Sequence, residues 1–416
     1  MTAPEVTAFA AGGADTGPER RGRNALAATV IAGHALKHLY LSGMQSIVLP
    51  EIKIAFGLSG TQLGTLATVR QFSGWATTMG AGYLGDRFSS RTGLMLAASM
   101  TLMGGAYFLV GLSSGFAFLF VALLLAGIGP SMYHPPAIGA LSRKFPDRRA
   151  LAISLHGTGG SVGEALGPVV ASGLLLLLTW RGLLQLSLLP ALVAAFLVWR
   201  VMSNLKLDEG GVESFLHYVR SLLTLLANKA LLLLVLITAL RSMGQSSITI
   251  FLPVYLREDL DYSATSVGLY LSLAQFVGIG SQPVMGYLSD RLGHKTVLLP
   301  AMAALGALCI LLRFAEGEAA LVLTVVALGA FLYSLHSIFI SAAIGVVGES
   351  SQATTVSLIY AASFLGTLSP IVAGVLADDF GTRSTFLYGA ALVFAGTVVL
   401  GAMRLPRAEP RITALH

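Results

Sequence analysis

Long apolar segments alternate with short polar ones along most of this chain. A helix needs about 20 apolar residues to cross the roughly 30 Å hydrocarbon layer of a bilayer. Six such segments in the first half cover residues 25–49, 61–84, 93–112, 116–139, 150–175 and 183–202. Six more in the second half cover 230–254, 264–288, 296–314, 319–345, 352–376 and 384–403. The pattern predicts an all-α membrane protein with twelve transmembrane helices.

The positive charges predict how these helices are oriented. Lys and Arg concentrate in every second loop, and the intervening loops hold only Lys53, Arg181, Arg257, Arg313 and Arg383. Because loops rich in Lys and Arg stay in the cytoplasm, both termini are predicted to be cytoplasmic. The predicted segments are a cytoplasmic tail (1–24), a six-helix bundle (25–203), a cytoplasmic linker (204–229), a second six-helix bundle (230–403) and a cytoplasmic tail (404–416).

A repeated motif relates the two halves. Residues 82–87 read GYLGDR and residues 286–291 read GYLSDR. Further pairs in nearly the same register are Leu49-Pro50 with Leu252-Pro253, Gly64 with Gly268, His134 with His336, and Gly167-Pro168 with Ser369-Pro370. A repeat of about half the chain predicts two pseudo-symmetric bundles packed face to face, which is the plan of a secondary transporter.

The composition agrees with a chain that lies in lipid. Hydrophobic residues make up 55% of it, charged residues make up 11%, and the mean hydropathy is +0.78. The net charge of +6 does not indicate nucleic-acid binding, because Lys and Arg are dispersed between apolar segments. Neither an enzyme nor a cofactor is expected, since the sequence has no nucleotide-binding glycine loop and no nucleophile–base spacing.

The repeated motif resembles the loop signature of the major facilitator superfamily, and the chain resembles that superfamily over its full length. The first copy ends at Arg91 and carries Ser89 where glycine is usual, whereas the second ends in Gly293-His294-Lys295. The resemblance implies a cytoplasmic gate formed by Asp86, Arg87, Arg91, Asp290 and Arg291. The alternative is that these residues form solvated turns that only satisfy the positive-inside rule.

A glycine-rich stretch in the fifth predicted helix is similar to the antiporter motif of drug–proton exchangers in the superfamily. Gly160, Gly163 and Gly167 leave a helix face without side chains, on which a neighbouring backbone can approach closely. Pro168 adds a bend. The alternative is tight packing that has no bearing on the direction of transport.

A narrower resemblance is to the fosmidomycin-resistance branch of these exporters. It depends on His38-Leu39, Gln45-Ser46, Tyr133-His134-Pro135, the glycine-rich fifth helix and Arg241. Two positions depart from that branch. Ser42 stands where an acidic residue is frequent, and Glu164 stands where a serine or small residue is frequent. An acidic proton carrier would therefore have moved from the first helix to the fifth.

Charged side chains inside the predicted helices indicate a water-filled cavity. An ionised side chain at the bilayer centre costs about 2.5–3.5 kcal/mol on insertion scales, so Lys37, Arg70 and Arg241 are expected to avoid lipid. The predicted substrate ligands are Lys37, His38, Gln45, Arg70, Arg241 and Gln245. Such a pocket is net positive and favours an anionic small molecule. Internal ion pairing, for example of Lys37 with Glu164, is the alternative.

Two titratable residues are predicted to carry protons. Glu164 is the first candidate and His38 is the second, because a carboxyl group in a partly dry cavity and an imidazole can both exchange protons in a transport cycle. His134 and His336, at equivalent places in the repeat, are predicted to make gate hydrogen bonds. No metal site is expected, because the only closely spaced histidine pair is His34 and His38.

These features favour a monomeric secondary transporter of the inner (plasma) membrane, which exports a small organic anion or amphipathic drug in exchange for protons. Anion uptake, by proton symport or by exchange of two anions, is the alternative. A receptor that no longer transports is a further alternative. The expected partners are a small-molecule substrate, protons and the lipid bilayer, and nucleic acid is not among them.

Overall fold

A computed structural model describes residues 17–145, 148–203, 227–315, 317–347 and 352–403, and the regular elements in these segments are helices. Residues 1–16, 204–226 and 404–416, which hold most of the predicted tails and linker, lie outside the described residues. The first half contains α1 (Gly17–Gly43), α2 (Leu49–Phe56), α3 (Gly60–Arg87), α4 (Thr92–Leu112), α5 (Phe116–Ser131), α6 (His134–Lys144), α7 (Arg149–Leu174), α8 (Trp180–Leu186) and α9 (Leu188–Met202).

The second half contains α11 (Lys229–Val254), α12 (Ala264–Leu292), α13 (His294–Phe314), α14 (Glu318–Leu332), α15 (His336–Val347), α16 (Gln352–Phe380) and α17 (Ser384–Ala402). A π-helical turn, Met44–Val48, joins α1 to α2, and a second one, Tyr255–Asp259, follows α11. The first turn directly precedes Leu49-Pro50, whereas the second follows the equivalent Leu252-Pro253, so the two turns lie on opposite sides of the matched pair.

The described residues contain nine helical runs that are long and apolar enough to cross a membrane. Helices α1, α3 and α7 are also long, at 27, 28 and 26 residues, but they fall short of that apolar character. They carry polar side chains such as Lys37, Arg70 and Glu164. The protein is therefore an all-helical, multi-pass membrane protein, whereas the count of twelve spans and the cytoplasmic termini stay predictions.

Several predicted helices are interrupted. The span expected at 116–139 is broken between α5 and α6, and the one expected at 319–345 is broken between α14 and α15. The first break follows from Pro130 near the end of α5 and from the prolines in the first turn of α6, because proline cannot donate the helical hydrogen bond. Each break places a histidine, His134 or His336, at the start of the next helix.

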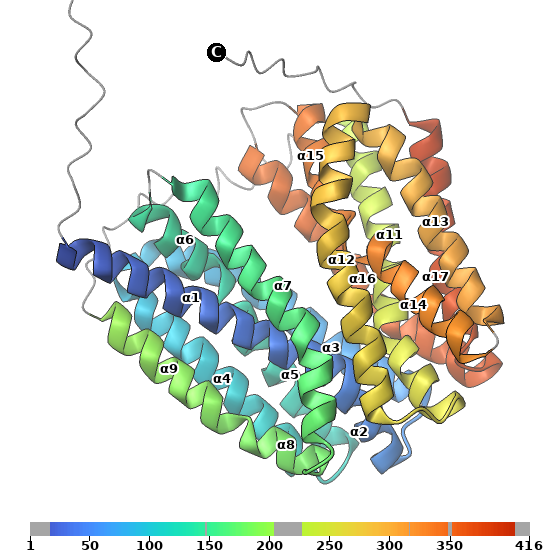
Figure 1. The fold of residues 1–416 in the computed structure, drawn as a ribbon, viewed down its shortest axis with the longest axis horizontal. Coiled ribbons are helices and arrows are strands. Elements are labelled where there is room, and N and C mark those ends of the chain that lie inside the picture. The colour runs from blue at the N-terminus through green and yellow to red at the C-terminus, as the bar shows by residue number, and fades with distance from the viewer. Residues whose placement is uncertain (1–16, 146–147, 204–226, 316, 348–351, 404–416) are drawn as a thin grey trace, which may run out of the picture.

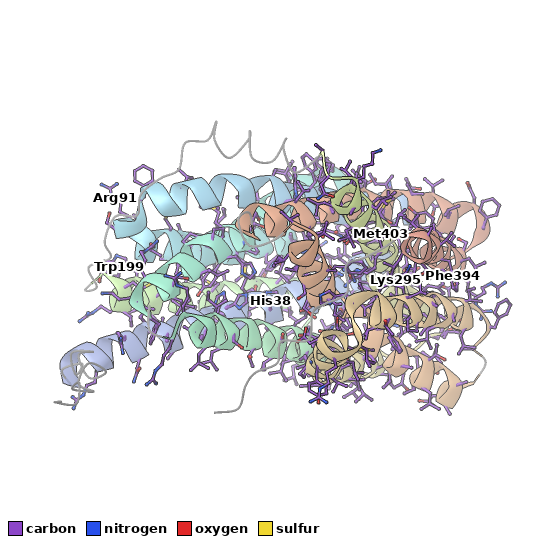
Figure 2. The ribbon with its side chains drawn as sticks, turned by 90° about the horizontal axis from the view of Figure 1, so that it is seen from above. His38, Arg91, Trp199, Lys295, Phe394 and Met403 are labelled. Carbon is purple, nitrogen blue, oxygen red and sulfur yellow. The ribbon has the colours of Figure 1, made fainter. Side chains whose placement is uncertain are left out.

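The helices form two groups, α1–α9 and α11–α17 (Figure 1). Each group has an apolar core of its own, and a few residues cross over, such as Phe251 in the first core and Ile47 in the second. The groups diverge toward the end that holds α6 and α15 and converge toward the end that holds α2 and α8 (Figure 1). His38 lies inside the molecule, near the middle of its long axis (Figure 2). The boundaries of the two predicted bundles stay predictions.

Two equivalent helix pairs join the groups. Helix α3 packs on α16, and α7 packs on α12. In each pair a glycine faces the carbonyl oxygen of a proline: Gly64 faces Pro370, and Gly268 faces Pro168. Without a Cβ the two backbones come close enough to pack directly, as is common between membrane helices.

Candidate functional site

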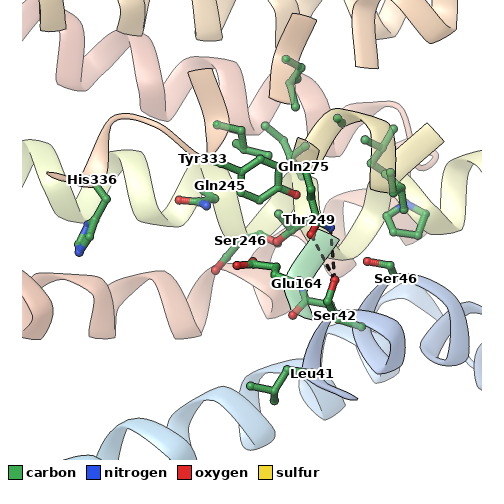
Figure 3. Close-up of a pocket in the computed structure, with 18 of the residues that line it drawn as sticks. Leu41, Ser42, Ser46, Glu164, Gln245, Ser246, Thr249, Gln275, Tyr333 and His336 are labelled. Carbon is green, nitrogen blue, oxygen red and sulfur yellow. Dashed lines mark hydrogen bonds between the residues drawn. The ribbon is translucent and has the colours of Figure 1, made fainter. Parts of the chain in front are cut away.

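A cavity of about 530 Å³ lies between the two groups. Its wall combines side chains from both halves (Figure 3). The polar and charged side chains that line it are His38, Ser42, Gln45, Ser46, Arg70, Gln71, Ser161, Glu164, Arg241, Ser242, Gln245, Ser246, Thr249, Gln275, Gln282, Tyr333, His336 and Ser363. A cavity of this volume suits a small organic molecule.

Two buried arginines face this cavity from opposite halves. Arg70 on α3 and Arg241 on α11 are 6% and 3% exposed. Arg70 Nη2 donates a hydrogen bond of 2.8 Å to Gln45 Oε1, and Arg241 Nη1 donates one of 2.9 Å to Gln245 Oε1. Because a glutamine is neutral, these bonds orient each guanidinium without compensating its charge. Glu164 is the one carboxylate that lines the cavity among the described residues.

Glu164 reaches the cavity from α7, and its side chain is 43% exposed there (Figure 3). Its Oε2 atom lies 3.9 Å from Nδ1 of His38 on α1. The two predicted proton carriers therefore face each other across the contact between α1 and α7. Their roles in proton transfer stay predictions.

Lys37 differs from its expected place. It is 2% exposed and is absent from the residues that line the cavity, whereas the adjacent His38 lines it. Successive residues of an α-helix are separated by about 100° around the axis, so these two side chains cannot point the same way. The expectation that Lys37 lines the cavity is wrong for this structure. Lys37 interacts electrostatically with Glu164 and with His34 behind the cavity wall.

Hydrogen bonds cross between the halves within the cavity wall. The hydroxyl of Ser42 on α1 donates to Gln275 Oε1 on α12 at 3.4 Å (Figure 3). The hydroxyl of Ser246 on α11 donates to Gln71 Oε1 on α3 at 3.3 Å. Single neutral hydrogen bonds contribute about 0.5–1.5 kcal/mol each, so these contacts can exchange during a conformational change.

Stronger contacts join the halves at the converging end, which we call the closed end. Arg257 Nε lies 2.6 Å from Glu51 Oε1, and Lys53 Nζ lies 2.5 Å from Glu258 Oε2. Both pairs connect α2 with the π-helical turn after α11. The cationic and anionic partners alternate between the halves, so each half contributes one charge of each sign.

An acidic side chain adds a third contact at the closed end. Asp378 on α16 accepts hydrogen bonds at 2.6 Å from the backbone N–H of Gly60 and at 2.8 Å from that of Thr61. It also accepts a 2.6 Å bond from the Thr61 hydroxyl. These N–H groups form the N-terminus of α3, where unpaired donors and the helix dipole favour an anion.

The expected gate residues lie at the opposite, diverging end. Asp290 and Arg291 end α12 and are exposed, and Arg91 is exposed before α4. The side chains of Asp86 and Arg87 lie outside the described residues. Within the described part of the chain, no contact joins Asp290 or Arg291 to the first half. Their gating role stays a prediction.

The glycine motif of α7 packs against α1. A Cβ on Gly163 would overlap the carbonyl oxygen of Ala35, and one on Gly167 would lie 2.7 Å from the carbonyl oxygen of Leu39. Gly160 instead faces the rings of His34 and His38. Pro168 turns its carbonyl oxygen toward Gly268 of α12, so the motif contacts both α1 and the other half.

His134 and His336 have different surroundings despite their equivalent positions. His134 Nε2 lies 3.3 Å from His34 Nε2, inside the first half. His336 lines the cavity, where it lies to one side of Gln245 and Tyr333 (Figure 3). Their predicted role in gate hydrogen bonds is untested by this arrangement.

Several cavity residues escaped the sequence analysis. Ser42, Gln71, Ser246, Gln275 and Tyr333 all line the cavity. The signal available for them was a polar side chain inside an apolar helix, as for Gln275 and Gln282, which are two turns apart on α12. Ser residues carry little such signal, because a serine hydroxyl in a helix can bond to its own backbone.

Comparisons with known proteins agree with this architecture. The family model of the Major Facilitator Superfamily matches residues 38–280 and 234–415. Relatives include the fosmidomycin resistance protein of Escherichia coli, which is 24% identical over 384 residues, 89% of this chain and 92% of the relative. The multidrug resistance protein MdtG of Escherichia coli is 27% identical over 332 residues, 76% of this chain and 78% of the relative.

Solved structures of transporters share the fold. The nucleoside transporter NupG has a TM-score of 0.73 at 14% identity, covering 91% of this chain and 98% of that chain. A bacterial homologue of the human lysosomal transporter Spinster, in an inward-facing and occupied conformation, has a TM-score of 0.71 at 16% identity, covering 93% and 96%. With the family model matched over most of its length, the chain belongs to the Major Facilitator Superfamily and is a multi-pass membrane transporter.

Proposed function

We propose that this transporter exports a small organic anion across the inner (plasma) membrane in exchange for protons, by alternating access. The observation that carries the anion assignment is the pair of buried cavity arginines, Arg70 and Arg241, each hydrogen-bonded to a neutral glutamine. Arginine binds carboxylate or phosphate groups through two parallel hydrogen bonds, which suits both planar and tetrahedral anions.

The charge balance of the cavity supports this cargo. Among the described charged residues that line it, two are positive and one, Glu164, is negative. Two guanidinium groups at membrane depth are costly to bury, and an anionic substrate lowers that cost while it is bound. The apolar residues Leu41, Ile279 and Leu328 supply contact area for the rest of the molecule.

The direction of transport rests on the relatives. Two of them are named for resistance to fosmidomycin and to multiple drugs, which supports efflux. Ion pairs join the two helix groups at the closed end, and the groups diverge at the end that holds the expected cytoplasmic gate. This arrangement supports a conformation in which the substrate enters the cavity from the cytoplasm. For the coupling ion, Glu164 is the proposed proton carrier, because it is the one carboxylate among the described residues that line the cavity with the two arginines.

A binding experiment tests the anion assignment. The purified protein is screened by thermal shift against phosphonates, carboxylates and cationic dyes, as wild type and as Arg241→Ala. Hydrogen bonds to charged groups contribute about 1.5–3 kcal/mol, so the variant should bind anionic hits roughly 10- to 100-fold more weakly. Arg313→Ala, at the end of α13 and outside the cavity lining, is the matched control. Stabilisation by cations alone would refute the assignment.

A transport experiment tests exchange against uptake. Reconstituted vesicles carry an internal pH indicator, and an anionic hit from the binding screen is added to one side. Exchange moves protons opposite to the substrate, whereas symport moves both the same way and anion exchange moves no protons. Glu164→Gln should abolish the coupled pH change but keep ligand binding. Co-directional movement of substrate and protons would exclude exchange in favour of the uptake alternative.

A further inference from the structure

Four histidines from three helices gather at the cavity wall, and His38 is the one of them that lines the cavity. His34 and His38 come from α1, His134 starts α6, and His156 comes from α7. The ring centroid of His34 lies 4.6 Å from that of His38, 4.5 Å from that of His134 and 3.8 Å from that of His156. We call these four residues the histidine cluster. The spacing along the sequence indicated only the pair on α1. The structure adds His134 from α6 and His156 from α7, so more than two imidazoles are close enough to act together.

We propose that His34, His38 and His134 form a binding site for a divalent transition-metal ion of the zinc type. One ligand nitrogen from each of the three residues can be chosen so that all lie within 4.8 Å of one another. Imidazole nitrogen is a preferred ligand of zinc, copper and nickel, and three histidines with an open fourth position make a familiar zinc site.

The distance between two of the ligand atoms fits this geometry. His34 Nε2 lies 3.3 Å from His134 Nε2. Two nitrogens bound tetrahedrally to one zinc ion at about 2.0–2.1 Å are roughly 3.3–3.4 Å apart. The two nitrogens are therefore already as far apart as two ligands of a tetrahedral zinc ion. Only the His38 ring must turn toward them.

An outer contact holds the His34 ring in a form suited to metal binding. His34 Nδ1 lies 2.7 Å from the carbonyl oxygen of His156, and since a carbonyl can only accept, Nδ1 carries the proton. Nε2 of His34 then keeps its lone pair for a metal. The carboxylate of Glu164 stands 3.9 Å from Nδ1 of His38, beyond hydrogen-bonding distance, and comes within reach of it only when the His38 ring turns toward the metal. Metal-bound histidines commonly donate their other N–H to a carbonyl or a carboxylate.

The surroundings let the rings lie close against α7, partly offset the local positive charge and give access from the cavity. Gly160 faces the rings of His34 and His38, where a Cβ would lie 2.9 Å from His34 Nδ1 and 3.1 Å from His38 Cδ2. Lys37 is the cation that interacts with the cluster, and Glu164 offsets its charge. His38 also lines the cavity, so an ion can enter from there and the fourth ligand position can face it.

The site is tested on the purified full-length protein without a polyhistidine tag. Zn²⁺ binding is measured by calorimetry, and Co²⁺ reports geometry through its visible absorption. We expect one Zn²⁺ per chain and the intense spectrum of four-coordinate Co²⁺. His34→Gln and His134→Gln should abolish both signals. Glu164→Gln should weaken Zn²⁺ binding about 10- to 100-fold, as loss of an outer contact does.

His336→Gln is the matched control, because His336 is the repeat partner of His134 and lies outside the three-histidine group. It should bind Zn²⁺ like the wild type. The thermal midpoint of each variant without metal shows that it is folded. Unchanged Zn²⁺ affinity in His34→Gln, the weak spectrum of six-coordinate Co²⁺ or no saturable binding to the wild type would each overturn the proposal. These measurements contain no organic anion, so their outcome does not test the proposal that the substrate is anionic.

Discussion

Gly268 on α12 lies directly against Pro168 on α7, so that a Cβ on Gly268 would be 2.7 Å from the Pro168 carbonyl oxygen. The repeat places Gly64 against Pro370 in the equivalent contact between α3 and α16. The halves are therefore joined by two related contacts. In each of them the backbone of one half packs directly against a glycine of the other half. A side chain at either glycine would separate the halves.

We expect Gly268→Leu to prevent the closed end from forming and to abolish transport. The leucine side chain cannot fit between two backbones in contact, so the conformation described here becomes inaccessible. Distances between spin labels on α2 and α12 measure the opening. Gly280→Leu is the control on the same helix, because a Cβ there meets no atom within 4 Å. Equal transport by the two variants would contradict this prediction.

Asp378→Asn should destabilise the closed end. The substitution replaces one acceptor oxygen with an NH₂ group facing the donors of Thr61, and it removes the negative charge from the N-terminus of α3. Losses of this kind cost about 0.5–2 kcal/mol. The thermal midpoint of the purified protein should fall in Asp378→Asn and stay nearly unchanged in Asp379→Asn, the exposed neighbour. A larger fall in Asp379→Asn would argue against the cap.

Reversing one charge of a closed-end ion pair should open that end, and reversing both should close it again. In Lys53→Glu two carboxylates face each other at the position of the present 2.5 Å contact with Glu258. Partly exposed pairs contribute about 0.2–1 kcal/mol, so the effect is a shift of population rather than unfolding. Labelling of a cysteine introduced into the cavity lining, by a reagent added from the closed side, measures the opening. If the double variant Lys53→Glu with Glu258→Lys is labelled as fast as the single variant, the ion pair does not stabilise the closed end.

Gly163→Ala should disturb packing between α1 and α7 more than an ordinary glycine substitution. The added Cβ would overlap the Ala35 carbonyl oxygen, and overpacking of this kind typically costs about 1–3 kcal/mol. Gly157→Ala on the same helix is the control, because its Cβ meets open space. Transport rates and thermal midpoints are measured for both variants. A loss of transport without a fall in the thermal midpoint indicates a contact that moves during transport, whereas a fall in both indicates a static packing contact. Normal stability and normal transport in Gly163→Ala would contradict the close approach.

The sequence by itself determined the class of protein and the kinds of side chain at its centre. Apolar length, the 55% hydrophobic composition and the repeat were sufficient for an all-helical membrane protein with related halves. Arg70, Arg241 and Glu164 could be chosen as cavity residues because a charge inside a membrane helix is too costly to face lipid. Both inferences depend only on the residue types and their positions along the chain, so they require no knowledge of the tertiary structure.

Only the tertiary structure decided which polar residues meet. Lys37 and His38 are adjacent in the sequence, yet one packs behind the cavity wall and the other lines the cavity, because the rotation of α1 is set by its packing against the glycines of α7. His134 joins His34 because the chain breaks and restarts at α6. Helix rotation, helix breaks and contacts between distant segments arise from side-chain packing, which a one-dimensional pattern does not contain.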